Sequence, residues 1–440
     1  MKRREFLEAG IAAGAGIGLL SSRETAAQDP APSAPLNVAL IGAGVHGRAL
    51  MSAALLIPGI RFRAVCDIWR YSRNTARNYL STYKQDANDY ADYDEMLRKE
   101  KELQAVIVAT PHFLHPEQTI ACLKAGLHVY CEKPMATSLD AARGMVRAAK
   151  ETGKLLQIGY QRRSNPRYQH AVDVLLRKAK LPGRLVHVGG QWNSGLKDDV
   201  GWPQKFAMRD DQLKQYGYAS MHELRNWRAF KKFSAGVFAE FGAQQVDAIN
   251  WFLGALPKSV VAAGGLDHYK TREGLDTVMA VLEYETAEGT VRALCEVQTA
   301  TSGAGEMTFE HFLGTDGSIK ISESPKWTKV FREPHAASWD DWARQGYLRA
   351  QEDPAAKKPP TSEEEHVRET GTVVPYELPA VLDKPLHQPH LENFFDAVRG
   401  KAKLNCPPEE AFRAEVVVHK VNEAVEAKKM LLLTQDDFKV

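Results

Sequence analysis

The stretch LNVALIGAGVHGRALMSAALLIPGIRFRAVCD, residues 36–67, decides the fold of this protein. Asn37–Ile41 is an apolar run of strand length that leads directly into Gly-Ala-Gly-Val-His-Gly at residues 42–47. A helical pattern follows, and a second apolar run, Phe62–Asp67, ends on an acid. Strand, glycine turn, helix and strand in this order are typical of the first βαβ unit of a dinucleotide-binding domain.

The three glycines of this pattern have different roles. Gly42 allows the tight turn, Gly44 lets the backbone approach a pyrophosphate, and Gly47 lets the helix pack closely against the strand. Val45 and His46 open the helix, whose amide groups and dipole favour phosphate. The pattern predicts a site for a nicotinamide dinucleotide, although a glycine turn without a ligand has the same spacing.

Asp67 indicates which dinucleotide binds. It ends the second strand, where a carboxylate can accept hydrogen bonds from the adenosine ribose hydroxyls and repels a 2′-phosphate. Arg70 and Arg73 lie close enough in the sequence to weaken that preference. The predicted cofactor is therefore NAD, with NADP the less favoured alternative.

Apolar strand runs alternate with helical patterns as far as residue 159. This alternation predicts a doubly wound parallel sheet with helices on both faces. Beyond the opening unit, the expected elements are a helix near Tyr71–Tyr83, then Ala105–Thr110, Glu117–Ala125, His128–Cys131, Leu139–Thr152 and Leu155–Gly159. We therefore expect an N-terminal Rossmann domain over residues 36–160.

Longer runs with alternating polarity follow, which predict a second α/β domain over residues 161–440 with an open, mixed and mainly antiparallel sheet. The expected strands are Arg184–Trp192, Ser259–Gly264, Thr277–Tyr284, Thr290–Thr299 and Met307–Gly314. The expected helices are Pro166–Lys178, Ala239–Leu253, His390–Val398 and Pro408–Lys428. Residues 325–384 are rich in Pro, Lys and Glu and are interpreted as an irregular insertion.

Residues 1–27 have the pattern of an export signal. Lys2, Arg3 and Arg4 precede an Ala- and Gly-rich apolar run, and small residues end the segment at about Ala27. The paired arginines make it similar to a twin-arginine signal for the periplasm, and Glu8 departs from that pattern. A short membrane anchor is the alternative. Residues 28–35 are a Pro-rich linker.

Composition excludes several classes of function. The formal net charge is +2, without a basic block interleaved with aromatic residues, so a nucleic-acid partner is not expected. The five cysteines are widely spaced and lack a CxxC or Cys/His pattern, which argues against a disulfide scaffold and a metal site. No run after the signal is long enough to span a bilayer, so no membrane association is expected once the signal is removed.

Four stretches resemble the glucose-fructose oxidoreductase and inositol dehydrogenase family (Gfo/Idh/MocA). They are ALIGAGVHG at 39–47, VATPHFLH at 108–115, KAGLHVYCEKP at 124–134 and GYQRRSNP at 159–166. The resemblance implies a Rossmann domain followed by an α/β domain, a sugar or polyol substrate, and association into oligomers through the sheet of the second domain. It also implies further cofactor-binding residues, namely Thr110, Pro111, His115, Glu132, Lys133 and Gln161.

Lys133 is the first candidate catalytic residue. Glu132-Lys133-Pro134 follows a predicted parallel strand, at the carboxyl edge where doubly wound sheets bind ligands. A lysine beside a nicotinamide ring could take the hydroxyl proton as a hydride leaves. The resemblance assigns Lys133 that role, although an isolated lysine is usually only a solvated charge.

The second catalytic element of the family is an Asp followed four residues later by a His. The matching segment here, residues 236–247, has Glu240 and Gln244 at those positions. Gln244 can orient a hydroxyl but cannot carry a proton. Acid–base chemistry is therefore assigned to Lys133, Glu240 or a histidine brought in by the fold, such as His112 or His222. An ordinary helix-surface pair has the same spacing.

Other polar and aromatic residues are expected to face the substrate, because aromatic faces and forked guanidinium donors suit a polyhydroxylated molecule. These candidates are Arg162, Arg163, Asn165, His222, Trp227 and Arg228. Each of them would also fit an interface between the domains.

Three functions remain open from the sequence. The first is an NAD(P)-dependent oxidoreductase that acts on a sugar, polyol or glycoside with a tightly bound, recycled cofactor. Export favours recycling, because a protein without an external NAD pool must reoxidise its cofactor in place. The second is a redox-neutral glycoside hydrolase or lyase that acts through a transient keto-sugar. The third is a sugar- or nucleotide-binding protein that has lost catalysis.

Overall fold

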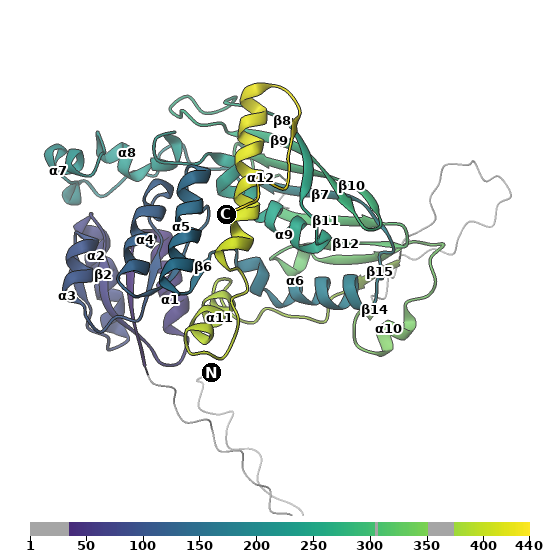
Figure 1. Ribbon diagram of the computed structural model, residues 1–440, viewed down its shortest axis with the longest axis horizontal. Helices are drawn as coiled ribbons and strands as arrows, with labels where there is room; N and C mark the ends of the chain where they lie inside the picture. Colours follow the sequence, from purple (N-terminus) through teal and green to yellow (C-terminus); the bar gives the residue numbers. More distant parts are fainter. Residues whose placement is uncertain (1–34, 304–306, 351–373) are drawn as a thin grey trace, which may run out of the picture. The chain divides into compact units, whose positions relative to one another are not determined.

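The computed structural model describes residues 35–303, 307–350 and 374–440 (Figure 1). The expected signal, and all of the expected linker except Pro35, lie outside these residues. The described chain forms a sheet of six strands and a sheet of ten strands. None of its helices is long and apolar enough to cross a membrane.

The six-stranded sheet is parallel throughout, in the order β3-β2-β1-β4-β5-β6. Its strands are β1 Leu36–Ile41, β2 Ile60–Cys66, β3 Asn88–Tyr90, β4 Ala105–Val108, β5 His128–Cys131 and β6 Leu156–Ile158. Every residue of β4 and β6 is buried, as expected of a parallel sheet covered on both faces. The predicted doubly wound sheet is confirmed.

Helices connect these strands as the sequence predicts, and α3 is an addition that the sequence did not reveal. They are α1 Val45–Leu55, α2 Arg70–Thr82, α3 Tyr93–Lys99, α4 His115–Lys124 and α5 Leu139–Thr152. The α5 helix has strong local signals, because the Ser138 side chain caps its start and Gly153 ends it at φ +66°. No side chain caps α1, whose first turn follows Gly44.

The chain returns to the Rossmann domain near its end, which the predicted boundary at residue 160 did not include. Helix α11, Gln388–Val398, places Leu391, Phe394 and Phe395 in one buried cluster with residues of α1 and of the parallel strands. Helix α12, Pro408–Ala427, packs against α5. The nucleotide-binding half is therefore assembled from both ends of the described chain.

The second sheet is mixed and mainly antiparallel, as predicted, because only its β7–β10 pair is parallel. The strand order is β14-β15-β13-β12-β11-β7-β10-β9-β8-β16. The strands are β7 Leu185–Asn193, β8 Pro257–Gly265, β9 Thr277–Thr286, β10 Gly289–Gln298, β11 Thr308–Gly314, β12 Gly317–Ile321, β13 Lys329–Arg332, β14 Arg349–Ala350, β15 Val374–Glu377 and β16 Leu431–Leu432. Burial alternates along β9, whose inward residues face the core.

The region expected to be an irregular insertion, residues 325–384, is partly regular. It contributes β13, β14 and β15 to one edge of the second sheet, together with the short helix α10, Asp340–Arg344. These strands are only two to four residues long, so they carry too little periodicity to be recognised in the sequence. Residues 351–373 lie outside the described chain.

Helical segments complete the second domain. The expected helix at Pro166–Lys178 begins as α6, Pro166–His170, and continues as a π-helix, Ala171–Lys178. The expected helix at Ala239–Leu253 is a π-helical turn, Phe238–Gly242, followed by α9, Ala243–Leu253. Glu240 lies in the π-helical turn, and such turns are frequent at functional sites.

Residues 194–235 form a segment whose structure the sequence did not predict. It contains α7, Asp210–Gln215, and α8, Met221–Arg225. Its apolar side chains pack against Trp69 of the Rossmann domain in a separate hydrophobic cluster. This 194–235 segment therefore joins the two halves of the protein on the side where the nucleotide site lies.

Candidate functional site

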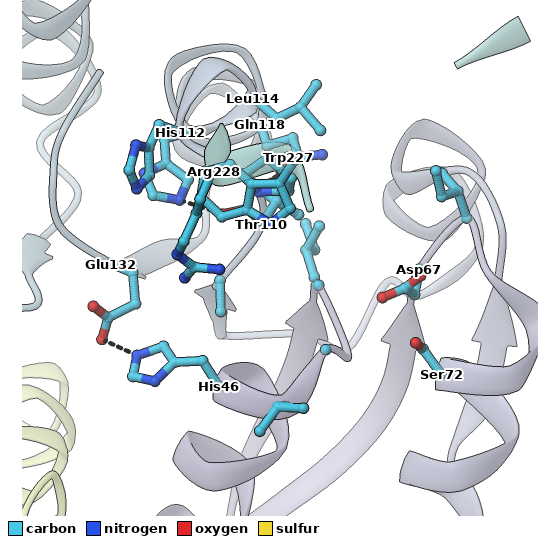
Figure 2. A pocket seen from close by; sticks show the side chains of 18 of the residues that line it. His46, Asp67, Ser72, Thr110, His112, Leu114, Gln118, Glu132, Trp227 and Arg228 are labelled. Carbon is cyan, nitrogen blue, oxygen red and sulfur yellow. Dashed lines mark hydrogen bonds and ion pairs between the residues drawn. The ribbon is translucent and has the colours of Figure 1, made fainter. Parts of the chain in front are cut away.

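Within the described residues, a cavity of about 1090 Å³ brings most of the predicted site residues of both domains together. Its walls come from the carboxyl ends of β1, β2, β4 and β5, from the 194–235 segment and from the π-helical turn that carries Glu240. Figure 2 shows Asp67 and Ser72 on one side of the cavity, with His112, Trp227 and Arg228 on the other. Because the lining residues come from both domains, a dinucleotide and a second molecule could contact different parts of the cavity wall.

The glycine loop has the space that a pyrophosphate needs. A Cβ on Gly42, whose φ is +90°, would lie 2.6 Å from the carbonyl carbon of Ala109, and a Cβ on Gly47 would lie 1.9 Å from the oxygen of Gly42. No atom lies within 4 Å of a Cβ built on Gly44, which lines the cavity. Gly42 and Gly47 are required for packing, whereas Gly44 leaves the first turn of α1 open to a ligand.

Asp67 directly follows β2 and lines the cavity, as expected of a residue that binds the adenosine ribose. Its Oδ2 accepts a hydrogen bond from the amide of Ala43 at 2.9 Å, and its Oδ1 accepts one from the amide of Trp69 at 2.8 Å. Burial raises the pKa of this carboxyl group, and these two amide donors oppose that effect. Asp67 therefore holds the glycine loop as well as facing the ribose position.

Neither of the two arginines that weakened the preference for NAD lines the cavity. Arg73 donates to Asp89 and to the carbonyl oxygens of Asp67 and Ile68. Arg70 is exposed and does not line the cavity. A carboxylate therefore faces this end of the cavity without a free arginine from α2, which fits NAD better than NADP.

Thr110, Pro111 and His115 follow β4 and line the cavity, as the resemblance implied. The ring of His115 is buried between two carbonyl oxygens, with Nδ1 2.8 Å from Pro134 O and Nε2 2.8 Å from Thr110 O. Burial lowers the pKa of His115, so the neutral ring donates to one of these oxygens at a time. It connects the loop after β4 with the loop that carries Lys133.

Glu132 and His46 both line the cavity, with His46 Nε2 3.2 Å from Glu132 Oε1 (Figure 2). The carboxylate also accepts from the amide of Lys133 at 3.2 Å. Burial by itself raises the pKa of Glu132, but the charge and hydrogen bond of His46 outweigh it and lower the pKa to about 2. Glu132 is therefore a fixed negative charge that orders the loop beside Lys133.

Lys133 and Glu240 meet in the cavity, although 107 positions separate them in the sequence. Lys133 Nζ donates to the backbone oxygen of Glu240 at 2.6 Å and lies 3.8 Å from its Oε1. Arg228 Nε lies 3.1 Å from Oε1 as well. Burial raises the pKa of Glu240, but Arg228 and Lys133, with the hydrogen bond from His112, outweigh it and hold the pKa well below its usual range. Glu240 stays ionised and cannot act as a general acid.

His112 completes this cluster as a neutral donor. Its Nδ1 accepts from the amide of Ala235 at 3.2 Å, so Nε2 carries the proton and donates to Glu240 Oε2 at 2.9 Å. Burial lowers the pKa of His112 to about 4, despite the neighbouring carboxylate. Trp227 packs against its ring edge with 4.6 Å between the ring centroids. His112 therefore orients Glu240, and its proton is not available for acid–base chemistry near neutral pH.

Gln244 and Gln161 face each other in the cavity wall. Gln244 Nε2 donates to Gln161 Oε1 at 2.6 Å, and Gln161 Nε2 donates to Glu323 Oε1 at 3.0 Å. Gln244 Oε1 is buried and has no hydrogen-bond partner within the described residues. An unpaired buried acceptor costs about 1–3 kcal/mol, so this oxygen is a ready acceptor for an amide or hydroxyl of a ligand.

Four predicted substrate residues do not line the cavity. Arg162 is fully buried in a network with Glu310 and Glu323, and Arg163 forms a bidentate pair with Asp247. These two predictions are wrong in geometry, because the turn at residues 161–164 aims both side chains into the second domain. Only Gln161 of that stretch lines the cavity.

Asn165 and His222 are the other two. Asn165 accepts from the amide of Arg167 and caps α6, which is a structural use of its side chain. His222 lies 3.1 Å from Asp199 on the 194–235 segment and is outside the cavity wall. Trp227 and Arg228, in contrast, line the cavity as predicted.

Several lining residues were missed by sequence reasoning. Examples are Trp69, Trp192, Arg225, Glu323 and His387. Trp69 lies two residues after Asp67, so its position was available in the sequence. The others come from segments distant in the chain that carry no motif, and only the folded chain brings them to the cavity.

Comparison with known proteins accounts for both domains. A family model described as "oxidoreductase family, NAD-binding Rossmann fold" matches residues 36–160, and one described as "oxidoreductase family, C-terminal alpha/beta domain" matches residues 210–432. Inositol 2-dehydrogenase of Salmonella typhimurium is 30% identical over 171 residues, which are 38% of this chain and 49% of that protein. The chain thus spans about half the length of this curated relative.

A second relative has a different reaction. The 2,7-anhydro-N-acetylneuraminate hydratase of Escherichia coli is 27% identical over 231 residues, which are 52% of this chain and 54% of that protein. Among solved structures, the WlbA dehydrogenase of Bordetella pertussis, in complex with NADH and UDP-GlcNAcA, matches with a TM-score of 0.67. That match has 19% identity and covers 92% of this chain and 100% of the other, which supports the shared fold.

Proposed function

The chain belongs to the Gfo/Idh/MocA oxidoreductase family, and we propose that it is an NAD-dependent oxidoreductase of a sugar, polyol or glycoside. One observation carries the proposal. The cavity that contains the open glycine loop and Asp67 also contains Lys133, held by Glu240 at the end of β5. The residues suited to a dinucleotide and a candidate proton acceptor therefore line the same cavity.

The residues that would hold the dinucleotide are those that the geometry leaves open to it. The first turn of α1 at Gly44 suits the phosphates, and Asp67 suits the adenosine ribose. Gln244 Oε1, which lacks a partner, suits the carboxamide of the cofactor or a substrate hydroxyl. When bound, the nicotinamide supplies a hydride acceptor or donor.

Lys133 is the residue of the cluster that can exchange a proton with the substrate. Glu240 remains ionised, His112 remains neutral and Gln244 has no proton to transfer. Lys133 in its neutral form would accept the hydroxyl proton of the substrate, and in its charged form it would return that proton. The backbone oxygen of Glu240 fixes the position of the lysine nitrogen during both steps.

Aromatic side chains near Lys133 favour a carbohydrate substrate. Trp192, Trp227 and Phe241 all line the cavity. Their apolar faces can cover the C–H faces of a sugar ring, while Arg228 and Glu323 supply a donor and an acceptor for its hydroxyl groups. Inositol 2-dehydrogenase, one of the relatives, is named for a polyol, which supports a substrate of this class.

The redox-neutral hydrolase or lyase is the second candidate. It is favoured by the hydratase relative and by the replacement of the catalytic His of the family by Gln244. Purified protein mixed with a panel of sugars and glycosides separates the candidates. A lasting increase in absorbance at about 340 nm supports net oxidation, and aglycone release without that increase supports the hydrolase or lyase. Binding of NADH without turnover of any compound would leave only the binding protein.

We also propose that the protein is exported to the periplasm. The paired Arg3 and Arg4 before an Ala- and Gly-rich run support export, and the five cysteines, all buried free thiols, support folding in a reducing compartment before transport. Cell fractionation tests this. Periplasmic protein that becomes cytoplasmic when both arginines are replaced by lysine supports the twin-arginine route, and unchanged cytoplasmic location contradicts export.

Association through the outer face of the second sheet is proposed as well. Val261, Met279, Val281 and Leu294 on strands β8–β10 are exposed apolar residues on that sheet. An apolar sheet face of this kind commonly mediates association. Light scattering of the purified protein tests the proposal, because replacement of Met279 and Val281 by threonine should reduce the measured mass to that of a monomer.

A further inference from the structure

The 194–235 segment lines the nucleotide end of the cavity. Of its residues, Val200, Tyr216, Tyr218, Leu224 and Arg225 line the same cavity as the glycine loop. Residues 194–209 also lie between the two family models, which end at residue 160 and begin again at residue 210.

The segment is attached to the Rossmann domain directly beside Asp67. Trp69 Nε1 donates to the carbonyl oxygen of Phe206 at 2.7 Å, and the rings of Tyr71 and Phe206 lie 4.9 Å apart. Leu213, Tyr218 and Phe233 are buried with Trp69 in one hydrophobic cluster. The aromatic residues that follow β2 are thus held by the segment, next to the expected ribose position.

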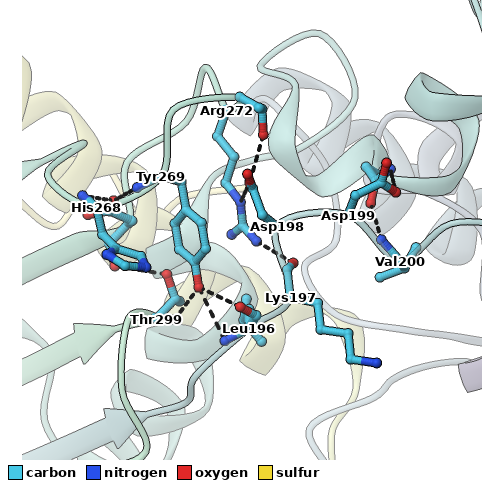
Figure 3. A network of polar contacts seen from close by, with 12 residues as sticks. Leu196, Lys197, Asp198, Asp199, Val200, His268, Tyr269, Arg272 and Thr299 are labelled. Carbon is cyan, nitrogen blue, oxygen red and sulfur yellow. Dashed lines mark hydrogen bonds and ion pairs between the residues drawn. The ribbon is translucent and has the colours of Figure 1, made fainter.

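The other attachment of the segment is a polar network at the second sheet (Figure 3). Tyr269 Oη donates to Leu196 O at 2.8 Å, and Arg272 Nη2 donates to Lys197 O at 2.8 Å. Thr271 Oγ1 donates to Asp198 Oδ1 at 2.7 Å. These bonds fix the start of the segment, while Ala235 at its end donates to His112. The segment is held at both ends and at Trp69.

Arg225 is the cation that this arrangement places in the cavity. Its guanidinium lies 5.2 Å from the centroid of the Trp69 ring, and its Nε donates to Gly201 O at 3.0 Å. Within the described residues, no carboxylate lies within ion-pair distance of it. Burial and the nearby charge of Arg48 lower the pKa of Arg225, and the more weakly acting charges of Asp67 and Asp199 oppose them. A cavity-lining arginine near a second arginine and without a paired carboxylate has the character of an anion site.

We propose that the 194–235 segment is a second wall of the dinucleotide site and that Arg225 on this wall binds the diphosphate of the cofactor. The glycine loop and the start of α1 offer backbone amides from one side, and the guanidinium offers forked donors from the other. Release of the cofactor then requires the segment to separate from Trp69 and Tyr71, so exchange is slow. Slow exchange is the property that a recycled cofactor needs.

Displacement of NADH fluorescence by ADP and by adenosine tests the role of Arg225, because only ADP carries the diphosphate. Arg225→Gln should weaken the competition by ADP about 10–100-fold and change that by adenosine less than twofold. For Arg225→Lys, the competition by ADP should be intermediate between that of the wild type and that of Arg225→Gln. Arg209→Gln is the matched control, because Arg209 lies on the same segment, pairs with Asp211 and is outside the cavity wall.

Equal weakening of ADP and adenosine, or no weakening of either, would overturn the role of Arg225. If Arg225→Gln does not fold, the same comparison with Arg225→Lys decides, since it keeps the charge and loses the forked donors. The proposal rests on the proposed function only for the identity of the cofactor. A protein that binds ADP through Arg225 but turns over no sugar would contradict the proposed function and leave this inference intact.

The rate of NADH release tests the wall itself. Phe206→Ala removes the ring that contacts Tyr71 without altering the lining of the cavity. Loss of one such aromatic contact should accelerate release about 3–10-fold. Tyr83→Ala, on the exposed surface of the Rossmann domain, is the control and should leave the rate unchanged. Equal rates for the two variants would show that the segment does not limit release.

Discussion

Two clusters of paired charges in the described residues differ in their access to the cavity, and only one of them belongs to the functional site. In the cavity cluster, Glu240 is shared by Lys133, Arg228 and His112. In the interior cluster, Arg163 is bound by both oxygens of Asp247, which is 1% exposed. Arg228 is half exposed and Lys133 reaches the cavity, whereas the interior pair is closed to any ligand.

The pKa values of the two carboxylates differ in the same way. Burial raises the pKa of Asp247, and Arg163 and Arg162 do not offset the combined effect of burial and the nearby charge of Glu410. Burial also acts on Glu240, but there the two cations and the histidine outweigh it and lower the pKa. A charge cluster is thus functional where its cations remain accessible to a ligand, and structural where the guanidinium is buried against its partner carboxylate.

The largest expected effect separates catalysis from binding in the cavity cluster. Lys133→Ala should lower turnover about 10²–10⁴-fold, the usual contribution of a general acid–base group. NADH affinity should change less than threefold, because the phosphates and ribose contact other residues. Steady-state kinetics and NADH titration of the same preparation check both numbers. Unchanged turnover would contradict the catalytic role of Lys133 and the functional role of the cavity cluster.

The next effect tests the interior pair. Asp247→Ala leaves the buried guanidinium of Arg163 without its bidentate partner, so the free energy of unfolding should fall by about 3–5 kcal/mol. Urea denaturation measures the loss. The folded fraction should keep its NADH affinity, because Asp247 is outside the cavity wall. A loss below about 1 kcal/mol would show that the interior cluster is not required for stability.

Glu240→Gln should lower turnover and leave stability nearly unchanged, in contrast to Asp247→Ala, which should lower stability. Loss of a hydrogen bond to a charged group costs about 1.5–3 kcal/mol, which corresponds to roughly 10–100-fold in turnover. Stability should change by less than about 1 kcal/mol, because Arg228 is half exposed and water can solvate it. Turnover and urea denaturation of this variant, compared with Asp247→Ala, measure the contrast. Similar stability losses in both variants would break the distinction between the clusters.

Glu415 is a third buried carboxyl group, and its effect on stability should depend on pH. Glu415 on α12 accepts from the amide of Met135 at 2.7 Å and from Tyr160 Oη at 3.2 Å, without a cation in ion-pair distance within the described residues. Burial raises its pKa from 4.5 to about 7. The protonated form therefore stabilises the fold. That contribution is complete below about pH 4 and is lost as the pH rises through about 7.

Glu415→Gln, which resembles the protonated acid, should remove this part of the pH dependence. The melting temperature of the wild type should fall relative to the variant between pH 5 and pH 8, by a few degrees. Thermal unfolding at four pH values checks this smallest effect. Parallel curves for the two proteins would mean that Glu415 does not titrate in this range.

Residues close in the sequence were predicted well. The glycine loop, Asp67, Glu132 and Lys133 are all found in the cavity, because each one follows a parallel strand and such strand ends meet at one edge of the sheet. The same reasoning failed for Arg162 and Arg163. They also follow a strand, β6, but the turn at residues 161–164 directs them away from the edge. Periodicity does not specify the direction of side chains in a turn.

The sequence by itself determined the two sheets, the dinucleotide loop and the lysine at the end of β5, because these depend on local periodicity and on glycines with steric roles. Only the tertiary structure decided what surrounds Lys133 and the cofactor site. It brought Glu240, His112 and Arg228 to one carboxylate-centred cluster, placed α11 in the Rossmann core and laid the 194–235 segment beside Asp67. Apart from the pair of Glu240 and Arg228, these contacts join residues more than one hundred positions apart, and their partners follow from burial and pairing in the folded chain rather than from any local pattern.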